Sequence, residues 1–217
     1  MKSISRAVTL LSALLPAIVL AQTPQQPPPA QPAPTGQQAP GQRPAAPPAP
    51  KLTVTSSAWP DGGEIPMKYS SRGDNKSPGF EFQWFTGTAP SAAPAALQSY
   101  AVIFHDVENA TMRGPADTLH WSAFDIPATA TGLAEGLASG DLPDGTINGP
   151  GLARRNGGAG GYFGPGAGPG PFHHYVFEFY ALDIKLSLPG TTTRDELLKA
   201  MEGHVVGKAA YFGRFHG

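Results

Sequence analysis

The stretch from Gln22 to Pro50 most constrains the fold, because it removes a block of the chain from any hydrophobic core. It consists mostly of Pro, Gln and Ala, and Arg43 is its only charged residue. A segment with almost no apolar side chain larger than alanine cannot offset the conformational entropy lost on folding. Its prolines favour extended polyproline II conformations. We expect a disordered, semi-rigid linker over residues 22–50, with a ligand for a proline-recognition domain as the alternative.

Residues 1–21 have the features of a secretory signal peptide. Lys2 and Arg6 precede an apolar run, and Val19 and Ala21 occupy the −3 and −1 positions of a cleavage site. The run is shorter than the roughly 20 residues that a membrane span needs. We therefore expect export to the periplasm or the medium, with no transmembrane segment in the mature chain. A retained N-terminal anchor is the alternative.

The absence of cysteine bears on the remaining segment, Lys51 to Gly217. An exported domain without disulfides depends on its own core, and a segment of this length can build one. Thiolate catalysis and cysteine-ligated metals are excluded. The formal net charge of −1 gives no indication of a nucleic-acid partner. We expect a single domain over residues 51–217.

The regular segments of this domain are mostly strand-like. Some alternate polar and apolar residues, and others are short apolar or aromatic runs bounded by polar residues or proline. The expected strands are Lys51–Ser56, Tyr100–His105, Leu119–Ile126, Tyr175–Leu182 and Lys208–Phe215.

One segment near the C-terminus is typical of a helix. Thr193 and Glu196 form a capping box, in which each residue satisfies a backbone donor of the first turn. An apolar stripe follows at Leu197, Leu198 and Met201, and Gly203 provides a stop. The chain is therefore expected to be mainly β with a late helix.

Side chains capable of chemistry gather in four places. An apolar run leads into His105-Asp106-Val107-Glu108, and His120-Trp121 begins another expected strand. His173-His174-Tyr175 opens the most apolar strand. The fourth place is Gly149–Gly170, in which ten of 22 residues are glycine. Glycine-rich backbone can bring N–H groups close to an anion, although a plain loop is the alternative. No Gly-Lys-Ser/Thr sequence supports a nucleotide loop.

Strand alternation sharpens the histidine predictions. Neighbouring side chains of a strand point to opposite faces. His173 and Tyr175 are therefore expected to share a pocket, with His174 facing away. By the same rule His120 is expected opposite Trp121, and on the same face as Ser122.

Several short motifs, in their order and spacing, resemble the phosphatidylethanolamine-binding protein family, in particular its bacterial Raf-kinase-inhibitor-like members. The resemblance spans essentially all of Lys51–Gly217. The matching segments are Asn75-Lys76-Ser77-Pro78 with Trp84, His105-Asp106-Val107-Glu108 at the Asp-Pro-Asp-Ala-Pro signature, His120-Trp121, Gly161-Tyr162-Phe163-Gly164-Pro165, Pro171-Phe172-His173-His174-Tyr175, and Glu202-Gly203-His204-Val205.

The first signature departs from the family pattern. Val107 stands where proline is usual, Glu108 where the second aspartate is usual, and His174 replaces an arginine. An insertion through Asp117 also lengthens the loop before His120. These changes affect the expected rim of the pocket.

The resemblance implies a large central antiparallel sheet, a smaller sheet and peripheral helices, including one near the C-terminus. It also implies a pocket for phosphate-like anions such as the phosphoethanolamine head group, without a cofactor or a catalytic residue. The residues implied to bind the ligand are Asp106, His120, Pro165, His173, Tyr175, Gly161 and Gly164. Asp106 is expected both to accept an N–H from a histidine and to receive the ammonium of ethanolamine.

Three other functions remain open. The aspartate, histidines and tyrosine are ingredients of general acid–base catalysis, so a hydrolase is one alternative, although no Gly-x-Ser-x-Gly nucleophile segment is present. A metal site formed by Asp106, His120 and His173 is the second. The third is an interaction module, for example a protease inhibitor, with residues 109–117 as a candidate loop.

Overall fold

The computed structural model describes residues 48–110 and 114–217. The predicted signal peptide, and the linker except its last residues, lie outside the described residues. The strands are β1 (Lys51–Thr55), β2 (Phe80–Thr86), β3 (Ala89–Pro90), β4 (Ser99–Asp106), β5 (Thr118–Pro127), β6 (Gly132–Leu133), β7 (Ile147–Asn148), β8 (His173–Leu182) and β9 (Val205–Phe215). The helices are the short 3-10 turn η1 (Met67–Tyr69), α1 (Leu152–Arg155) and α2 (Arg194–Met201).

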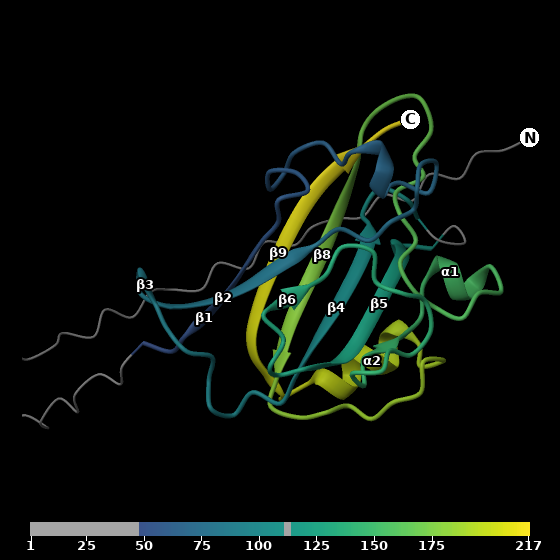
Figure 1. Cartoon of the computed structure of the whole chain (residues 1–217). Coiled ribbons are helices and arrows are strands. Elements are labelled where there is room, and N and C mark those ends of the chain that lie inside the picture. Colours follow the sequence, from purple (N-terminus) through teal and green to yellow (C-terminus); the bar gives the residue numbers. More distant parts are fainter. Residues whose placement is uncertain (1–47, 111–113) are drawn as a thin grey trace, which may run out of the picture. The chain divides into compact units, whose positions relative to one another are not determined.

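These strands form two antiparallel sheets (Figure 1). The larger sheet has five strands in the order β7-β5-β4-β8-β9. The smaller sheet has the order β1-β2-β3, and β6 pairs with β2. This arrangement confirms the predicted fold class, a mainly β protein with a large antiparallel sheet, a smaller sheet and a helix near the C-terminus.

The central strand β4 is buried along its whole length, as its apolar run predicted. Its alternate side chains serve two separate cores. Val102 and Phe104 point to the face covered by the smaller sheet, and Ala101 and Ile103 point to the face covered by α2. We call these the inner and the outer face of the large sheet.

The inner core is mainly aromatic. Phe177 of β8 stacks on Phe104 with ring centroids 3.9 Å apart, and Phe80 of β2 contacts Phe177 from the smaller sheet. Phe104 and Phe177 are completely buried. Burial of each such ring stabilises the fold by about 1.5–3 kcal/mol.

Helix α2 begins with the predicted capping box, since the Thr193 and Glu196 side chains each bond to the other's backbone N–H. Leu197 and Met201 face the outer core, and Gly203 has a φ of +80°, which suits glycine after a helix. The predicted apolar stripe was wrong at one position. Leu198 is 36% exposed, because its side chain turns away from the sheet towards a cavity.

No helix within residues 48–110 and 114–217 combines the length and apolar character that crossing a bilayer requires.

Candidate functional site

The candidate site begins where β4 ends and β8 begins. Asp106, the last residue of β4, pairs with Tyr175 of β8. His173 begins β8 two positions before Tyr175, so it lies at the same end of the sheet as Asp106. His173 and Tyr175 line one cavity, as strand alternation predicted. His174 is exposed and bonds to Glu108 instead. Strand pairing therefore brings together residues about 70 positions apart, because a ladder fixes which residues face each other.

His120 reaches the same cavity through a β-bulge. Phe104 pairs with Trp121 and His105 pairs with Leu119, which leaves His120 as an extra residue in β5. The His120 ring lies 5.3 Å from the Phe104 ring, and Trp121 also belongs to the inner core. The prediction that His120 lies opposite Trp121 was therefore wrong, since the bulge interrupts the alternation.

The predicted pairing of His120 with Ser122 on one face was also wrong. A side chain added at Gly149 would meet both Ser122 Oγ and Phe124, and Phe124 belongs to the outer core. Ser122 Oγ donates to the carbonyl of Pro150 at 2.9 Å. The serine is thus separated from the candidate site by the sheet and does not serve as its nucleophile.

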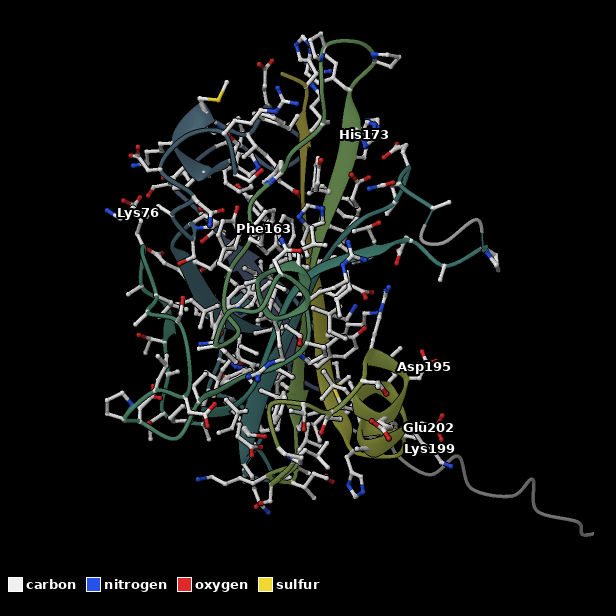
Figure 2. The ribbon with its side chains drawn as sticks, turned by 90° about the vertical axis from the view of Figure 1, so that its right-hand side faces the viewer. Lys76, Phe163, His173, Asp195, Lys199 and Glu202 are labelled. Carbon is white, nitrogen blue, oxygen red and sulfur yellow. The ribbon has the colours of Figure 1, made fainter. Side chains whose placement is uncertain are left out.

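The cavity at this end of the inner face has a volume of about 220 Å³. Its wall contains four of the predicted ligand-binding residues and five others. These nine residues are Asp106, His120, His173 and Tyr175, with Asn109, Leu152, Phe163, Gly166 and Ala167. Figure 2 shows Phe163 and His173 in the same part of the molecule, well separated from Asp195 on α2. We call this space the inner cavity.

Asp106 holds the inner cavity together by hydrogen bonds. One carboxylate oxygen accepts His173 Nδ1–H at 2.8 Å, which is the predicted contact with a histidine. The other accepts the backbone N–H groups of Glu108 at 3.1 Å and Asn109 at 3.2 Å. Asp106 therefore fixes the His173 ring and leaves its Nε2 for a ligand.

His120 is a neutral group at pH 7. Burial lowers its pKa from 6.5, and the charge of Arg155 acts in the same direction. Backbone hydrogen bonds with Phe163 and Gly164, and the charge of Asp106, oppose that shift without cancelling it. Nδ1 lies 2.9 Å from the Phe163 carbonyl, so Nδ1 carries the proton and Nε2 remains for a ligand.

Tyr175 adds a hydroxyl group. The hydroxyl is buried and has no hydrogen-bond partner among the described residues. Burial, and then the charge of Asp106, raise its pKa, so it keeps its proton over the physiological range. A buried hydroxyl without a partner is costly, and a ligand that accepts its hydrogen bond would recover that cost.

The glycine-rich loop contributes different residues from those predicted. Phe163, Gly166 and Ala167 line the inner cavity, whereas Gly161, Gly164 and Pro165 do not. The Gly164 N–H is not available to a ligand, because it donates to Asn75 Oδ1 at 2.8 Å. The carbonyl of Pro165 accepts a hydrogen bond from Ser71 N–H.

The loop is thereby anchored to the segment around residues 69–75. A side chain at Gly164 would lie 2.1 Å from the Tyr69 carbonyl, and the Tyr162 hydroxyl donates to that same carbonyl. Gly161 lies against Ser139. The three predicted residues therefore shape the loop and position its lining neighbours. Simple alternation could not identify Ala167 or Gly166, because this loop has no regular period.

The side chains that could together hold a metal ion differ in one member from the predicted set of Asp106, His120 and His173. Atoms of Asp106, Glu108 and His173 lie within 4.8 Å of one another, whereas His120 is not part of this group. Both Glu108 oxygens accept hydrogen bonds from His174 at 2.6 Å, and Asp106 binds His173. A cation would have to replace these bonds.

Both the sequence and the fold of this chain are similar to those of known proteins. The family model described as phosphatidylethanolamine-binding protein matches residues 55–216. A protein from Methanothermobacter thermautotrophicus, named UPF0098 protein, is 34% identical over 166 residues, which cover 76% of this chain and 98% of the relative. LppC of Mycobacterium tuberculosis, which is named a lipoprotein, is 33% identical over 175 residues, covering 79% of this chain and 76% of LppC.

Two crystal structures have the same fold. A phosphatidylethanolamine-binding protein homologue from Chlamydia trachomatis superposes with a TM-score of 0.63 at 30% identity, covering 77% of this chain and 98% of that one. YbcL of E. coli superposes with a TM-score of 0.62 at 22% identity, covering 77% and 99%. The matched family model and these relatives show that the chain belongs to the phosphatidylethanolamine-binding protein family.

Proposed function

We propose that this protein binds small phosphate-bearing ligands, of the phosphoethanolamine head-group type, in the inner cavity. The observation that carries the proposal is the convergence of hydrogen-bonding groups in one small space. The Tyr175 hydroxyl lacks a partner among the described residues, and His120 and His173 each have one ring nitrogen committed and one left over. Phosphate oxygens are strong acceptors for such groups.

The protonation state of His120 supports a ligand that brings a proton or a negative charge. Neutral His120, with Nδ1–H bonded to Phe163, has an acceptor at Nε2. A phosphate monoanion can donate its own proton to that nitrogen, or the dianion can favour a protonated ring. Either route gives a charge-assisted hydrogen bond.

The carboxylates support a zwitterionic ligand. Asp106 lines the inner cavity, and Glu108, whose side chain is 39% exposed, has a carboxylate oxygen within 4.8 Å of side-chain atoms of Asp106 and His173. A cavity for inorganic phosphate alone has little reason to keep two carboxylates nearby. An ethanolamine ammonium beside Asp106 and Glu108 would offset their charge, while the histidines and Tyr175 hold the phosphate.

Export is part of the same proposal. The features of residues 1–21 and the relative named a lipoprotein support passage across the cytoplasmic membrane. The ligand would then be met in the periplasm or outside the cell.

The test is a titration of the purified protein, without a histidine tag, with phosphoethanolamine, followed through its histidine NMR resonances. We expect saturable shifts at His120 and His173 with phosphoethanolamine and none with ethanolamine alone. His173→Gln should weaken binding about tenfold, the worth of one charge-assisted hydrogen bond.

His174→Gln is the matched control, because His174 neighbours His173 but faces away from the inner cavity. It should leave the dissociation constant within about twofold. The proposal fails if millimolar phosphoethanolamine shifts neither His120 nor His173, or if the two glutamine variants bind equally well.

A further inference from the structure

A second and larger cavity lies beside α1 and α2, with a volume of about 520 Å³. This volume lies within the range of about 300–1,000 Å³ that is typical of small-molecule sites. The residues that matter for its chemistry are Leu119, Pro150, Leu198, Arg154, Arg155 and Arg194. We call it the outer cavity.

The outer cavity lies on the other face of the large sheet from the inner cavity. Leu119 of β5 packs with the outer core, and α2 covers that same core. Figure 2 shows Asp195, which borders the outer cavity, on α2 and well separated from Phe163 and His173. The outer cavity is therefore a separate site and not an extension of the inner one.

The floor of the outer cavity is apolar. Helix α2 buries Leu197 and Met201 in the outer core, but its Leu198 is 36% exposed and borders the cavity together with Leu119 and Pro150. Neighbouring apolar side chains left open in one hollow favour an apolar ligand group, because covering them removes their surface from water.

Three arginines stand around this floor. Arg154 is committed to structure, since its guanidinium donates to the carbonyls of Asn148 and Ala159. Arg194 pairs with Asp117. The exposed Arg155 differs from both, because its side chain has no hydrogen bond or ion pair with any residue in the described part of the chain.

The charges of the outer cavity favour an anion. Its two carboxylates are Asp117, which is paired with Arg194 and His105, and Asp195. Three guanidinium groups therefore face two carboxylates, and Arg155 is the cation left for a ligand. The planar guanidinium matches a carboxylate through two parallel hydrogen bonds.

We propose that the outer cavity binds a small amphipathic carboxylate, such as a medium-chain fatty acid. Arg155 takes the carboxylate, and the apolar chain covers Leu119, Pro150 and Leu198. A purely polar phosphate does not suit this floor, and a cationic amphiphile does not suit the arginines. This assignment is independent of the ligand of the inner cavity.

Helix α1 connects the two cavities, which provides a second readout. Leu152 at its start lines the inner cavity, and Arg155 at its end lines the outer one. Burial is the main cause that lowers the pKa of His120, and the charge of Arg155 adds a smaller effect in the same direction. A carboxylate bound to Arg155 offsets that charge, so the pKa of His120 should rise when the outer cavity fills.

The test is calorimetric titration of the purified protein with decanoate below its micelle concentration. Butyrate and decyltrimethylammonium are the comparison ligands, since the first lacks the long chain and the second reverses the charge. We expect saturable binding of decanoate, at least about tenfold weaker binding of butyrate, and none of the cation. Arg155→Gln and Leu198→Gln should each weaken decanoate binding about tenfold.

Lys199→Gln is the matched control, because it removes one positive charge from α2 at a position that does not line the outer cavity. It should bind decanoate like the parent. Thermal unfolding and circular dichroism of each variant exclude misfolding as the cause of a loss. NMR of His120 should show its pKa rising in Arg155→Gln and, in the parent, on addition of decanoate.

Two results would overturn the assignment. The first is nonspecific adsorption of decanoate. It would be indicated if decyltrimethylammonium bound as well as decanoate, or if Arg155→Gln left decanoate binding unchanged. The other is the absence of decanoate binding together with a dimer that Leu198→Gln converts to a monomer, which would make this face a contact between copies of the chain.

Discussion

The two faces of the large sheet end in cavities of opposite character. The inner cavity is small, and an aspartate, two histidines and a tyrosine line it beside a tightly stacked aromatic core. The outer cavity is more than twice as large, and leucine, proline, arginine and aspartate side chains line it, without a histidine or a tyrosine from the described residues. Both cavities use β5 and α1, so the difference comes from which side of the same backbone each side chain leaves.

The contrast between the two faces shows how close packing and incomplete covering affect the side chains of the same sheet differently. On the inner face the aromatic core determines where the polar groups stand, so it can hold His120 neutral and leave the Tyr175 hydroxyl without a partner. On the outer face the short helices cover the sheet incompletely, and Leu198 stays partly exposed. We therefore expect substitutions of the inner face to affect stability more.

The largest expected effect is that of Phe177→Ala. Phe177 is fully buried and stacks on Phe104, so the substitution should cost about 3–5 kcal/mol of unfolding free energy. On the outer face, Leu198→Ala should cost less than about 1 kcal/mol. Urea unfolding followed by circular dichroism measures both. Similar losses for the two variants would contradict the contrast between the faces.

Asp106→Asn tests whether the ligand of the outer cavity binds without any contribution from the hydrogen-bonding groups of the inner cavity. The amide keeps the shape of the side chain but removes the charge that holds His173 Nδ1–H. Phosphoethanolamine binding should weaken about tenfold, because a charge-assisted hydrogen bond becomes a neutral one. Decanoate binding in the outer cavity should not change. Calorimetry with each ligand decides the matter, and a loss of both would indicate a general disturbance of the fold.

The pH dependence of stability should reveal the buried His120. Because its pKa in the folded protein is lowered from 6.5, the unfolded chain binds this proton more readily. The free energy of unfolding should therefore be highest above pH 6.5, decrease as the pH falls through that value, and level off below the folded pKa. His120→Gln should flatten the curve below pH 6.5. A parent curve with no slope there would contradict the neutral state assigned to His120.

The smallest expected effect is that of Glu108→Gln. The Glu108 carboxylate and the His174 ring form a hydrogen bond between side chains that are 39% and 58% exposed, so its loss should cost less than about 1 kcal/mol. If Glu108 meets the ligand ammonium, phosphoethanolamine should bind more weakly while inorganic phosphate binds unchanged. Equal changes for both ligands would remove Glu108 from that role.

Local patterns predicted much of the fold. The apolar run of β4, the aromatic run of β8 and the capping box of α2 each depend on a few neighbouring residues, and all three are confirmed. The shared pocket of His173 and Tyr175 also follows from strand alternation. Such features are readable because backbone geometry repeats over two or four residues.

The errors lie where a distant residue decides the outcome. The bulge at His120 depends on how β5 pairs with β4, and it cannot be predicted from residues 118–122 alone. Gly164 was expected at the ligand, but Asn75, which is 89 positions away, takes its N–H. Leu198 was expected in the core, yet only the placement of α2 on the sheet decides which part of its stripe is covered.

The sequence by itself therefore determined five of the nine strands in the described residues, the late helix, the family resemblance and four of the residues that meet in the inner cavity. Tertiary structure alone decided which loop atoms line that cavity, the side of the sheet on which His120 lies, and the existence of the outer cavity. The physical reason is that periodicity and capping are local interactions, whereas cavities are what remains when elements distant in sequence pack against one another.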